Sequence, residues 1–463
     1  MTASSRNNLI ANSKKRSKKI QEYIKNNKSR ADTKMVKNVF QFDKISAVKV
    51  YDLPRDLLIL NPENGRFEAE LDIIREERKS KGMSLELDPE NDKDVEIIRN
   101  MLKGIHPKNA EREGAFKKLY ENIEEVASKT GTNGQEEPGI ITHDGILVNG
   151  NRRDTVMEEL AISTKKRKGN PLKYNNLRVA ILDKDVSAYD LWKNEAKEQI
   201  SQESREEYDY VNSALEIKRG YELLRKKGLT DKKAKDEIAK TLYGRSVKDV
   251  EGYLDFLKIA DLFLKQIGKK GQHRYIQDSG SNAGEKGIVT ILKEVAKQRI
   301  ADQKAGKDDE EIAKWFKAAS LFCVISKRKP TISKSGKTKK LNFGHRDYRR
   351  FMSKAMATPE TRKRVLESKA FLNVKITDPS LEHMNGFSDA IDNAIGLYEV
   401  QTTINNPLIL LQKAEDALSE LSKDLNSSHK KEMIKIMKDG DGDQIIKDIK
   451  SLIAEITKKN KNN

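Results

Sequence analysis

The sequence predicts an α+β domain followed by helical domains, and three observations support this fold class. Residues from about 45 to 190 mix short β-rich apolar runs with helical patterns in irregular order, as α+β proteins do. Beyond Ser187 almost every segment has the spacing of apolar residues that is typical of helices. The composition, with 36% hydrophobic and 35% charged residues, is rich in charge yet supports several modest cores.

The 463 residues are enough for two or three folded domains. We expect four segments along the chain: a basic N-terminal arm over 1–44, an α+β domain over 45–190, a helix-turn-helix domain over 191–275, and a helical C-terminal region over 276–463.

The charge balance indicates a polyanionic partner. The chain carries 90 Lys and Arg against 72 Asp and Glu, a net charge of +18, and its pI is near 9.4. Such an excess favours nucleic acid as the partner. The basic N-terminal arm lacks the apolar core of a secretion signal, and it either contacts phosphates or is simply solvated.

The chain has one cysteine and no long apolar run. Cys323 lies in the apolar run AASLFCVI, so we expect it to pack in a core, and a disulfide framework is excluded. Since the chain contains no stretch of about 18 consecutive apolar residues, we expect no transmembrane helix. These features together predict a cytoplasmic protein without a membrane partner.

The first half of the α+β domain begins with a strand or two and a turn, near KISAVKVYDLPRDLLILNPENGRF. A charged helix, a loop and another helix follow, up to about residue 105. AFKKLYENIEEVASKTG is a clearer helix, with Gly131 as its C-terminal stop. The apolar residues that share one face of this helix are Phe116, Leu119, Ile123 and Val126.

The second half of this domain contains two apolar runs, GIIT and GILV, which predict strands joined at Asp144-Gly145. A helix is expected to open near Asp154, and NLRVAILDKD predicts another strand. Two arginines stand beside a glycine between the GILV strand and this helix. Glycine lets the backbone approach an anion closely, a helix N-terminus offers free N–H groups, and arginine donates to phosphate in pairs. Gly150, Arg152 and Arg153 therefore predict either a phosphate cradle or an exposed basic turn.

The helical part begins with a long region over 189–228, with a break expected near Tyr208. Two short helices about a tight turn follow, and Thr230 or Asp231 is expected to cap the first. This pattern is typical of a helix-turn-helix, the alternative being a plain helical hairpin. Its inner faces contain the apolar residues Ile238, Ala239 and Leu242, then Val247, Val250, Leu254 and Leu257.

The second of these helices would contact DNA through Arg245, Ser246 and Lys248, because these side chains suit phosphates and base edges. Asp249 and Glu251 on the same outward face would repel phosphate, which predicts that this helix recognises DNA bases narrowly, at few positions, or weakly. Near the end of the chain, a bundle helix or a dimer contact is expected over Leu411, Ala414, Leu418, Leu421 and Leu425.

The order of these motifs resembles that of the ParB family of DNA-partition proteins, within the ParB/sulfiredoxin-like superfamily. The resemblance covers roughly residues 45 to 265. The matching positions are Asn61, Pro62, Asn64 and Arg66 for an Asn-Pro-x-x-x-Arg box, Pro138 to Val148 for a hydrophobic segment ending in Asp-Gly, Gly150 to Arg153 for a Gly-x-Arg-Arg box, and Glu195, Glu198, Gln199, Gln202 and Arg205 for a Glu-Asn-x-x-Arg helix.

The resemblance implies a ParB/sulfiredoxin-like fold that holds a nucleotide triphosphate, CTP in true partition proteins, with Mg²⁺. It implies that Gly150, Asn151, Arg152, Arg153, Asn64 and Arg66 bind the nucleotide, and that Glu195 or Glu198 is the catalytic and metal residue. It also implies a homodimeric clamp on DNA. The alternative for the two glutamates is a solvated helix face.

The chain departs from the family pattern in ways that leave its chemistry open. The Glu-Asn-x-x-Arg box is not intact, and the position after Gly150 is Asn151, where the sulfiredoxin branch requires cysteine. The leading interpretation is DNA binding regulated by a nucleotide triphosphate, in partition, transcription control or phage biology. The alternatives are an enzyme, either a nuclease or a CTPase-like hydrolase, and a non-enzymatic DNA-binding adaptor.

Overall fold

The structure is a computed structural model of the chain. It describes residues 3–27, 35–104, 110–200, 210–242, 245–277, 287–327 and 345–404, with the single residues 447 and 451. Two compact units divide the chain: one comprises Met1–Arg349 with Asn373–Met384, and the other comprises Arg350–Leu372 with Asn385–Asn463. Each unit is described by itself.

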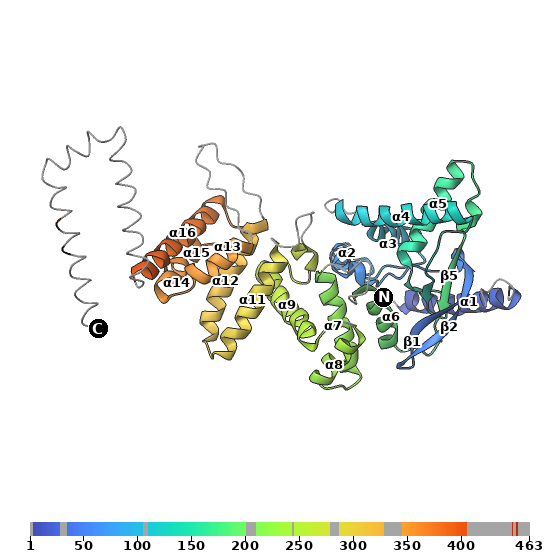
Figure 1. Cartoon of the computed structure of the whole chain (residues 1–463), viewed down its shortest axis with the longest axis horizontal. Helices are drawn as coiled ribbons and strands as arrows, with labels where there is room; N and C mark the ends of the chain where they lie inside the picture. Colours follow the sequence, from blue (N-terminus) through green and yellow to red (C-terminus); the bar gives the residue numbers. More distant parts are fainter. Residues whose placement is uncertain are drawn as a thin grey trace. The chain divides into compact units, whose positions relative to one another are not determined.

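A five-stranded mixed sheet forms the centre of the α+β domain (Figure 1). The strands lie in the order β1-β2-β5-β3-β4, and only the β3–β5 pair is parallel. The apolar runs expected to form strands do so, which confirms the α+β fold class. The strand bounds are β1 (Val36–Gln41), β2 (Lys44–Pro54), β3 (Gly139–Ile141), β4 (Leu147–Asn149) and β5 (Asn176–Ile181).

Helices cover this sheet and share one core with it. The core contains apolar side chains from α1, α2, α3, α4 and α5, together with Leu53, Leu177 and Val179 of the sheet. Gly131 follows α4 with φ +71, as expected for a helix stop. The helix bounds are α1 (Ala3–Asn26), α2 (Glu68–Ser80), α3 (Asp92–Lys103), α4 (Ala110–Thr130) and α5 (Asn151–Lys166).

The N-terminal segment belongs to the α+β fold, where the sequence predicted a separate arm. Strand β1 lies within residues 1–44 and pairs with β2 along its whole length. Helix α1 packs on the same core through Ile20, which is 1% exposed, with Tyr23 and Ile24 beside it. The reason is the spacing of these three apolar residues, which places them on one face of the helix.

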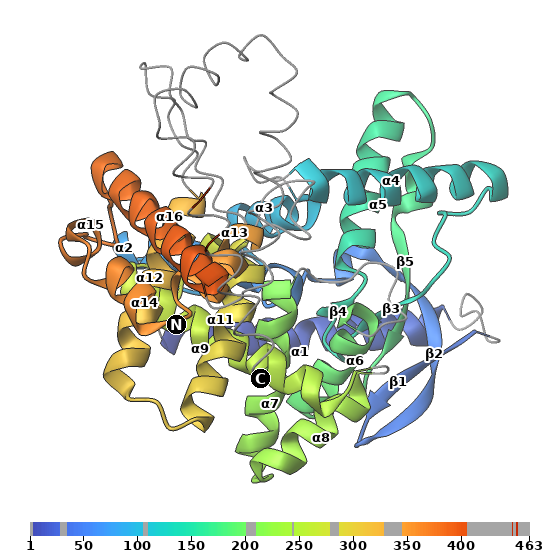
Figure 2. The ribbon, with the colours of Figure 1, turned by 60° about the vertical axis from the view of Figure 1, so that its left-hand side comes forward.

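Helices α6 (Ala188–Ile200), α7 (Tyr210–Lys226), α8 (Asp231–Thr241) and α9 (Val247–Gln266) follow the sheet. Figure 2 shows α7, α8 and α9 packed together beside α6. Thr230 caps α8 by accepting from the Lys233 N–H, as expected. Helix α9 is 20 residues long, where the sequence predicted a short helix, because the buried residues Phe256, Ala260 and Phe263 extend its apolar face.

The chain continues with η5 (His273–Ile276), α11 (Ile288–Lys304), α12 (Asp309–Lys327) and α13 (His345–Arg350). Cys323 is fully buried on α12, which confirms its expected place in a core. None of the helices within the described residues combines the length and the apolar character that crossing a membrane requires.

The second unit contains α14 (Pro359–Leu366), α15 (Lys369–Leu372) and most of α16 (Leu381–Ile404). Its core includes the ring of Phe387, whose centroid lies 6.3 Å from that of Phe351 and 6.0 Å from that of Phe371. The leucine repeat from Leu411 to Leu425 and the break expected near Tyr208 lie outside the described residues.

Candidate functional site

The turn between β4 and α5 has the backbone that the sequence predicted. Gly150 is the N-cap residue of α5. Its φ is +106, a backbone conformation that residues other than glycine rarely adopt. Helix α5 begins at Asn151, three residues earlier than expected, because the glycine lets the chain turn directly from strand to helix. Gly150 has no side chain to cap the helix, so the first N–H groups of α5 form the positive end of its dipole at this turn.

Asn151 holds this turn to the segment that follows β2. Its side chain is 3% exposed, its Oδ1 accepts a 2.8 Å hydrogen bond from the Asn61 N–H, and its Nδ2 donates to the Leu147 carbonyl. Both polar atoms are therefore used within the protein. The expected contact of Asn151 with a nucleotide would come from its main chain alone.

The two arginines of the turn contact different elements. Arg152 Nε donates to the Leu102 carbonyl near the end of α3, at 3.3 Å. Arg153 donates to the Glu137 carbonyl at 2.6 Å and to Asn149 Oδ1 at 3.3 Å. The oxygens that accept these hydrogen bonds are neutral carbonyl and amide oxygens, and Arg153 also pairs with the Glu137 carboxylate, whose Oε2 lies 3.8 Å from its Nη2.

The loop NPENGRF lies between this turn and helices α6 and α7. Asn64 is buried, and its Oδ1 accepts from the N–H of half-buried Arg66. The Gly65 N–H donates to Glu195 Oε1 on α6 at 2.8 Å, and the Arg66 carbonyl accepts from Asn212 on α7 at 2.6 Å. The structure therefore brings together three of the motifs that the resemblance singled out: the Asn61–Arg66 loop, the Gly150 turn and Glu195.

Two buried carboxylates and one arginine lie where this loop meets α6 and α7. Arg219 Nη1 lies 3.6 Å from Glu195 Oε2 and 3.5 Å from Glu216 Oε2, and it donates to the Glu63 carbonyl. Glu216 is 1% exposed. Burial raises the pKa of the Glu216 carboxyl, and nearby Glu195 raises it further, while Arg219 opposes both effects. The net effect is a raised pKa, which favours the protonated form of Glu216.

The acidic residues of this site do not fit Mg²⁺ in this arrangement. Glu195 has one oxygen on the Gly65 N–H and the other beside Arg219, so its carboxylate is already neutralised. The part of the chain that the structure describes contains no group of three or more His, Cys, Asp or Glu side chains placed to hold a metal ion. Glu198 belongs to α6, but its side chain lies outside the described residues.

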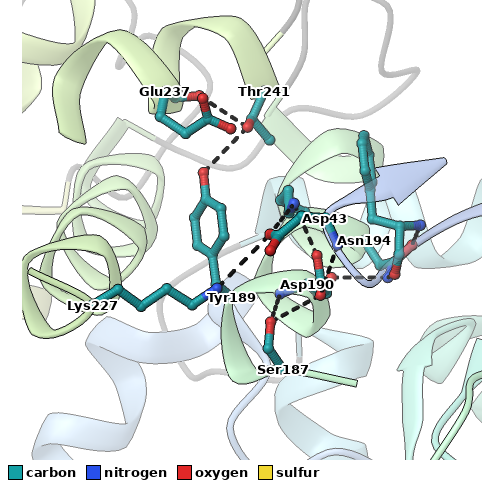
Figure 3. Close-up of polar contacts among 10 residues, drawn as sticks. Asp43, Ser187, Tyr189, Asp190, Asn194, Lys227, Glu237 and Thr241 are labelled. Carbon is teal, nitrogen blue, oxygen red and sulfur yellow. Dashed lines mark hydrogen bonds and ion pairs between the residues drawn. The ribbon is translucent and has the colours of Figure 1, made fainter. Parts of the chain in front are cut away.

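The β1–β2 hairpin is anchored to the same helix α6 (Figure 3). Asp43 at its turn has its carboxylate 3.3 Å from Lys193 Nζ on α6 and 3.8 Å from Lys227 Nζ, just after α7. Asn194 both accepts from the Phe40 N–H and donates to the Phe40 carbonyl. Helix α6 therefore presents Asn194 to the sheet while its next residue, Glu195, holds the NPENGRF loop.

Tyr189 extends this contact to α8 (Figure 3). Its hydroxyl lies 3.3 Å from Thr241 Oγ1, which in turn donates to the Glu237 carbonyl. Burial raises the pKa of the Tyr189 hydroxyl well above its usual value. Helix α6 thus touches the sheet, the candidate site and α8, the first helix of the predicted helix-turn-helix.

The predicted DNA-contacting residues lie at the start of α9. Ser246 is its N-cap, and its side chain and that of Asp249 hydrogen-bond each other's N–H groups in a capping box. Lys248 is exposed, and the Arg245 guanidinium lies 5.9 Å from the centre of the Tyr253 ring. Asp249 is held in the cap, so its charge lies close to the helix N-terminus, which it stabilises.

Three residues of α7 belong to the site and were not predicted from the sequence. Asn212, Glu216 and Arg219 recur at spacings of four and three, which is the spacing of one helix face. The signal that could have revealed them is this polar stripe between the buried apolar residues Val211, Ala214 and Ile217.

Comparison of the chain with models of known protein families, with curated proteins and with solved structures finds no match. The similarity to the ParB family therefore remains a resemblance of motifs and their order.

Proposed function

We propose that this chain is a DNA-binding protein whose hold on DNA is regulated by a nucleotide triphosphate bound at the Gly150 turn. In this proposal Gly150 and the N–H groups of α5 bind phosphate oxygens, and Arg152 and Arg153 turn from their carbonyl acceptors to the phosphates. By the motif resemblance the nucleotide is CTP and the working form is a homodimer.

The residues at the turn suit a phosphate group. A helix N-terminus with a glycine at its N-cap lets an anion approach the backbone N–H groups, and two guanidinium groups add paired donors. Phosphate is an ionised acceptor whose oxygens can take paired donors from a guanidinium, so it competes well with the neutral Leu102 and Glu137 carbonyls.

The observation that carries the proposal is the connection from this turn to the helix-turn-helix. Asn151 holds Asn61, the Asn61–Arg66 loop is held by Glu195 and Asn212, and α7 packs against both α8 and α9. A phosphate that shifts the turn therefore acts on a loop hydrogen-bonded to α6 and α7, and α7 packs against α8 and α9, the helices proposed to contact DNA. Such a connection is needed if nucleotide binding is to change the affinity of the chain for DNA.

Binding of DNA is assigned to α8 and α9. The chain has a net charge of +18, and Arg245 and Lys248 supply positive charge at the start of α9. We expect replacement of both by Gln to weaken binding and to reduce its dependence on salt, because each lost phosphate contact removes about 0.9 from the slope of log affinity against log salt.

The test measures binding of CTP, ATP and GTP to the full chain by calorimetry, with and without duplex DNA, for three proteins. In Arg152→Ala we expect nucleotide binding to weaken about tenfold or more, since a charge-assisted donor is lost. The matched control is Arg167→Ala at the other end of α5, where the arginine pairs with Glu124 on the surface. This control should bind nucleotide as the unchanged chain does.

Two outcomes would contradict the proposal and identify an alternative. Nicking of plasmid DNA with Mg²⁺, independent of any nucleotide, would indicate a nuclease. An Arg152→Ala protein that loses DNA affinity, in a chain that binds no nucleotide, would indicate an adaptor whose turn holds the DNA backbone. Release of phosphate from the bound nucleotide would not contradict the proposal. It would show that the chain also hydrolyses the nucleotide that regulates its DNA binding.

A further inference from the structure

Helix α1 concentrates positive charge. Its 24 residues contain seven Lys and Arg against one Glu, a net charge of +6 out of +18 for the whole chain. Five of these seven residues are lysines, and all five are exposed: Lys14, Lys15, Lys18, Lys19 and Lys25. Their spacings of four and seven residues place them along one side of the helix.

The opposite side of α1 is fixed to the α+β domain. Ile20, Tyr23 and Ile24 pack on the core. Ser13 Oγ donates to Asp144 Oδ2 at 2.6 Å, and Arg16 donates to the Asp144 carbonyl and pairs with Glu90. The lysines are therefore held outward on a rigid support, which makes them a surface of defined geometry.

The charges of this face are hardly neutralised by the protein itself. Glu22 is the one carboxylate among them, and its nearest ion pair is a 3.8 Å contact with Lys18, both being exposed. Within the described residues, the other four lysines of the face have no ion pair. Lys14 with Lys18 and Lys15 with Lys19 are like charges four residues apart, an arrangement that destabilises a helix unless an anion screens it.

We propose that this lysine face of α1 is a second surface for duplex DNA, which contacts the sugar–phosphate backbone without reading sequence. The choice of DNA as partner rests on the proposed function, and the surface lies on a different element from α8 and α9. A regular row of phosphates is the polyanion that a row of lysines at helical spacing fits. An anionic membrane fits less well, because a helix that lies on a membrane inserts its apolar face, and the apolar face of α1 is buried.

The test uses the full chain and a short fluorescent duplex of random sequence, with affinity measured from about 50 to 200 mM salt. The variant replaces Lys14, Lys15, Lys18 and Lys19 by Gln, which keeps the helix propensity. We expect its slope of log affinity against log salt to fall by about two to four, and its affinity to fall about tenfold or more.

The matched control replaces Lys117, Lys118, Lys165 and Lys166 by Gln on α4 and α5. These lysines are exposed, the change in net charge is the same, and Lys117 has the same 3.8 Å contact to a Glu four residues later as Lys18 has. The control should keep the slope of the unchanged chain. Equal thermal unfolding temperatures for all three proteins show that α1 remains docked.

Three results would overturn the proposal. The first is an unchanged salt slope in the α1 variant, and the second is a control variant that loses as much slope and affinity as the α1 variant. The third is tighter binding of the unchanged chain to phosphatidylserine vesicles than to DNA at equal salt. Replacement of Arg245 and Lys248 by Gln keeps the two proposals apart. If α8 and α9 do not bind DNA, this variant keeps full affinity while the α1 variant still loses it.

Discussion

Glu216 is a carboxylic acid that the fold keeps away from water. Its side chain lies beside Arg219, which also contacts Glu195, and the residue is 1% exposed. Burial raises the pKa of this carboxyl from 4.5 to about 8. Because Arg219 also contacts Glu195 and the Glu63 carbonyl, the protonation of Glu216 acts on the arginine that joins α7 to the loop.

We expect Glu216 to make the protein less stable as pH rises. Below pH 4.5 both the folded and the unfolded states carry the proton; between about pH 4.5 and 8 the unfolded state releases it and the folded state does not, so the free energy of unfolding falls. Glu216→Gln keeps the neutral shape and should remove this fall. Urea unfolding at several pH values between 5 and 8 checks the prediction.

The control for this substitution is Glu222→Gln, at an exposed position of the same helix. It should leave the dependence of stability on pH as it is in the unchanged chain. A Glu216→Gln protein whose stability still falls over the same pH range would show that another group is responsible.

At the scale of elements, the packing of α6 on α7 depends on an indole ring and a glycine. Trp192 on α6 is fully buried, and its Nε1 donates to the Glu216 carbonyl at 2.8 Å. A Cβ atom at Gly220 on α7 would meet this ring at 2.4 Å. Glycine is required here because two helices approach closely, although a helix interior otherwise disfavours it.

We expect Gly220→Ala to lower the free energy of unfolding by about 2 kcal/mol or more, because the rigid indole must move in a packed core. The same change at Gly252 on α9, where a Cβ atom would meet nothing within 4 Å, should raise stability by about 0.5–1 kcal/mol through helix propensity. Thermal and urea unfolding of both variants measure these changes in the free energy of unfolding. Equal changes in stability at Gly220 and Gly252 would contradict the close approach of Gly220 to the Trp192 ring.

At the scale of the whole first unit, several contacts connect the α+β domain to the helices that follow it. Asn212 holds both the Arg66 carbonyl and the Ala69 N–H. His273 lies between Asp72 on α2 and Asp261 on α9; burial opposes its charge, but hydrogen bonds to these two carboxylates outweigh burial and raise its pKa to about 9. The cationic form therefore fastens α2 to α9 at neutral pH.

We predict that Asn212→Ala separates nucleotide binding from DNA binding. Under the proposed function the Gly150 turn is untouched, so nucleotide affinity should stay within about threefold. The effect of nucleotide on DNA affinity should decrease, because the loop loses the hydrogen bond from Asn212 on α7 to the Arg66 carbonyl. DNA titrations with and without CTP measure this effect. The control is Asn170→Ala, which removes a side-chain hydrogen bond at the start of the short helix η4 (Pro171–Tyr174) and should leave the effect unchanged.

Local patterns in the sequence predicted most strands and helices, because apolar spacing, glycine stops and caps act within a few residues. The strands at GIIT and GILV, the stop at Gly131 and the cap at Thr230 are such cases. The site could be predicted only in part. Asn151 was expected to face a nucleotide, but its amide faces Asn61, 90 positions away, and no local pattern reveals such a partner.

The sequence by itself determined the α+β-then-helical order, the glycine at the turn before α5, the buried cysteine and the excess of positive charge, since each depends on residue type or on spacing along the chain. Only the tertiary structure decided that α1 joins the core, that Glu195 binds Gly65 and Arg219, and that α7 supplies Asn212 and Glu216. The physical reason is that these contacts join segments tens of residues or more apart. Burial, which sets the ionisation of Glu216, exists only once those segments have packed.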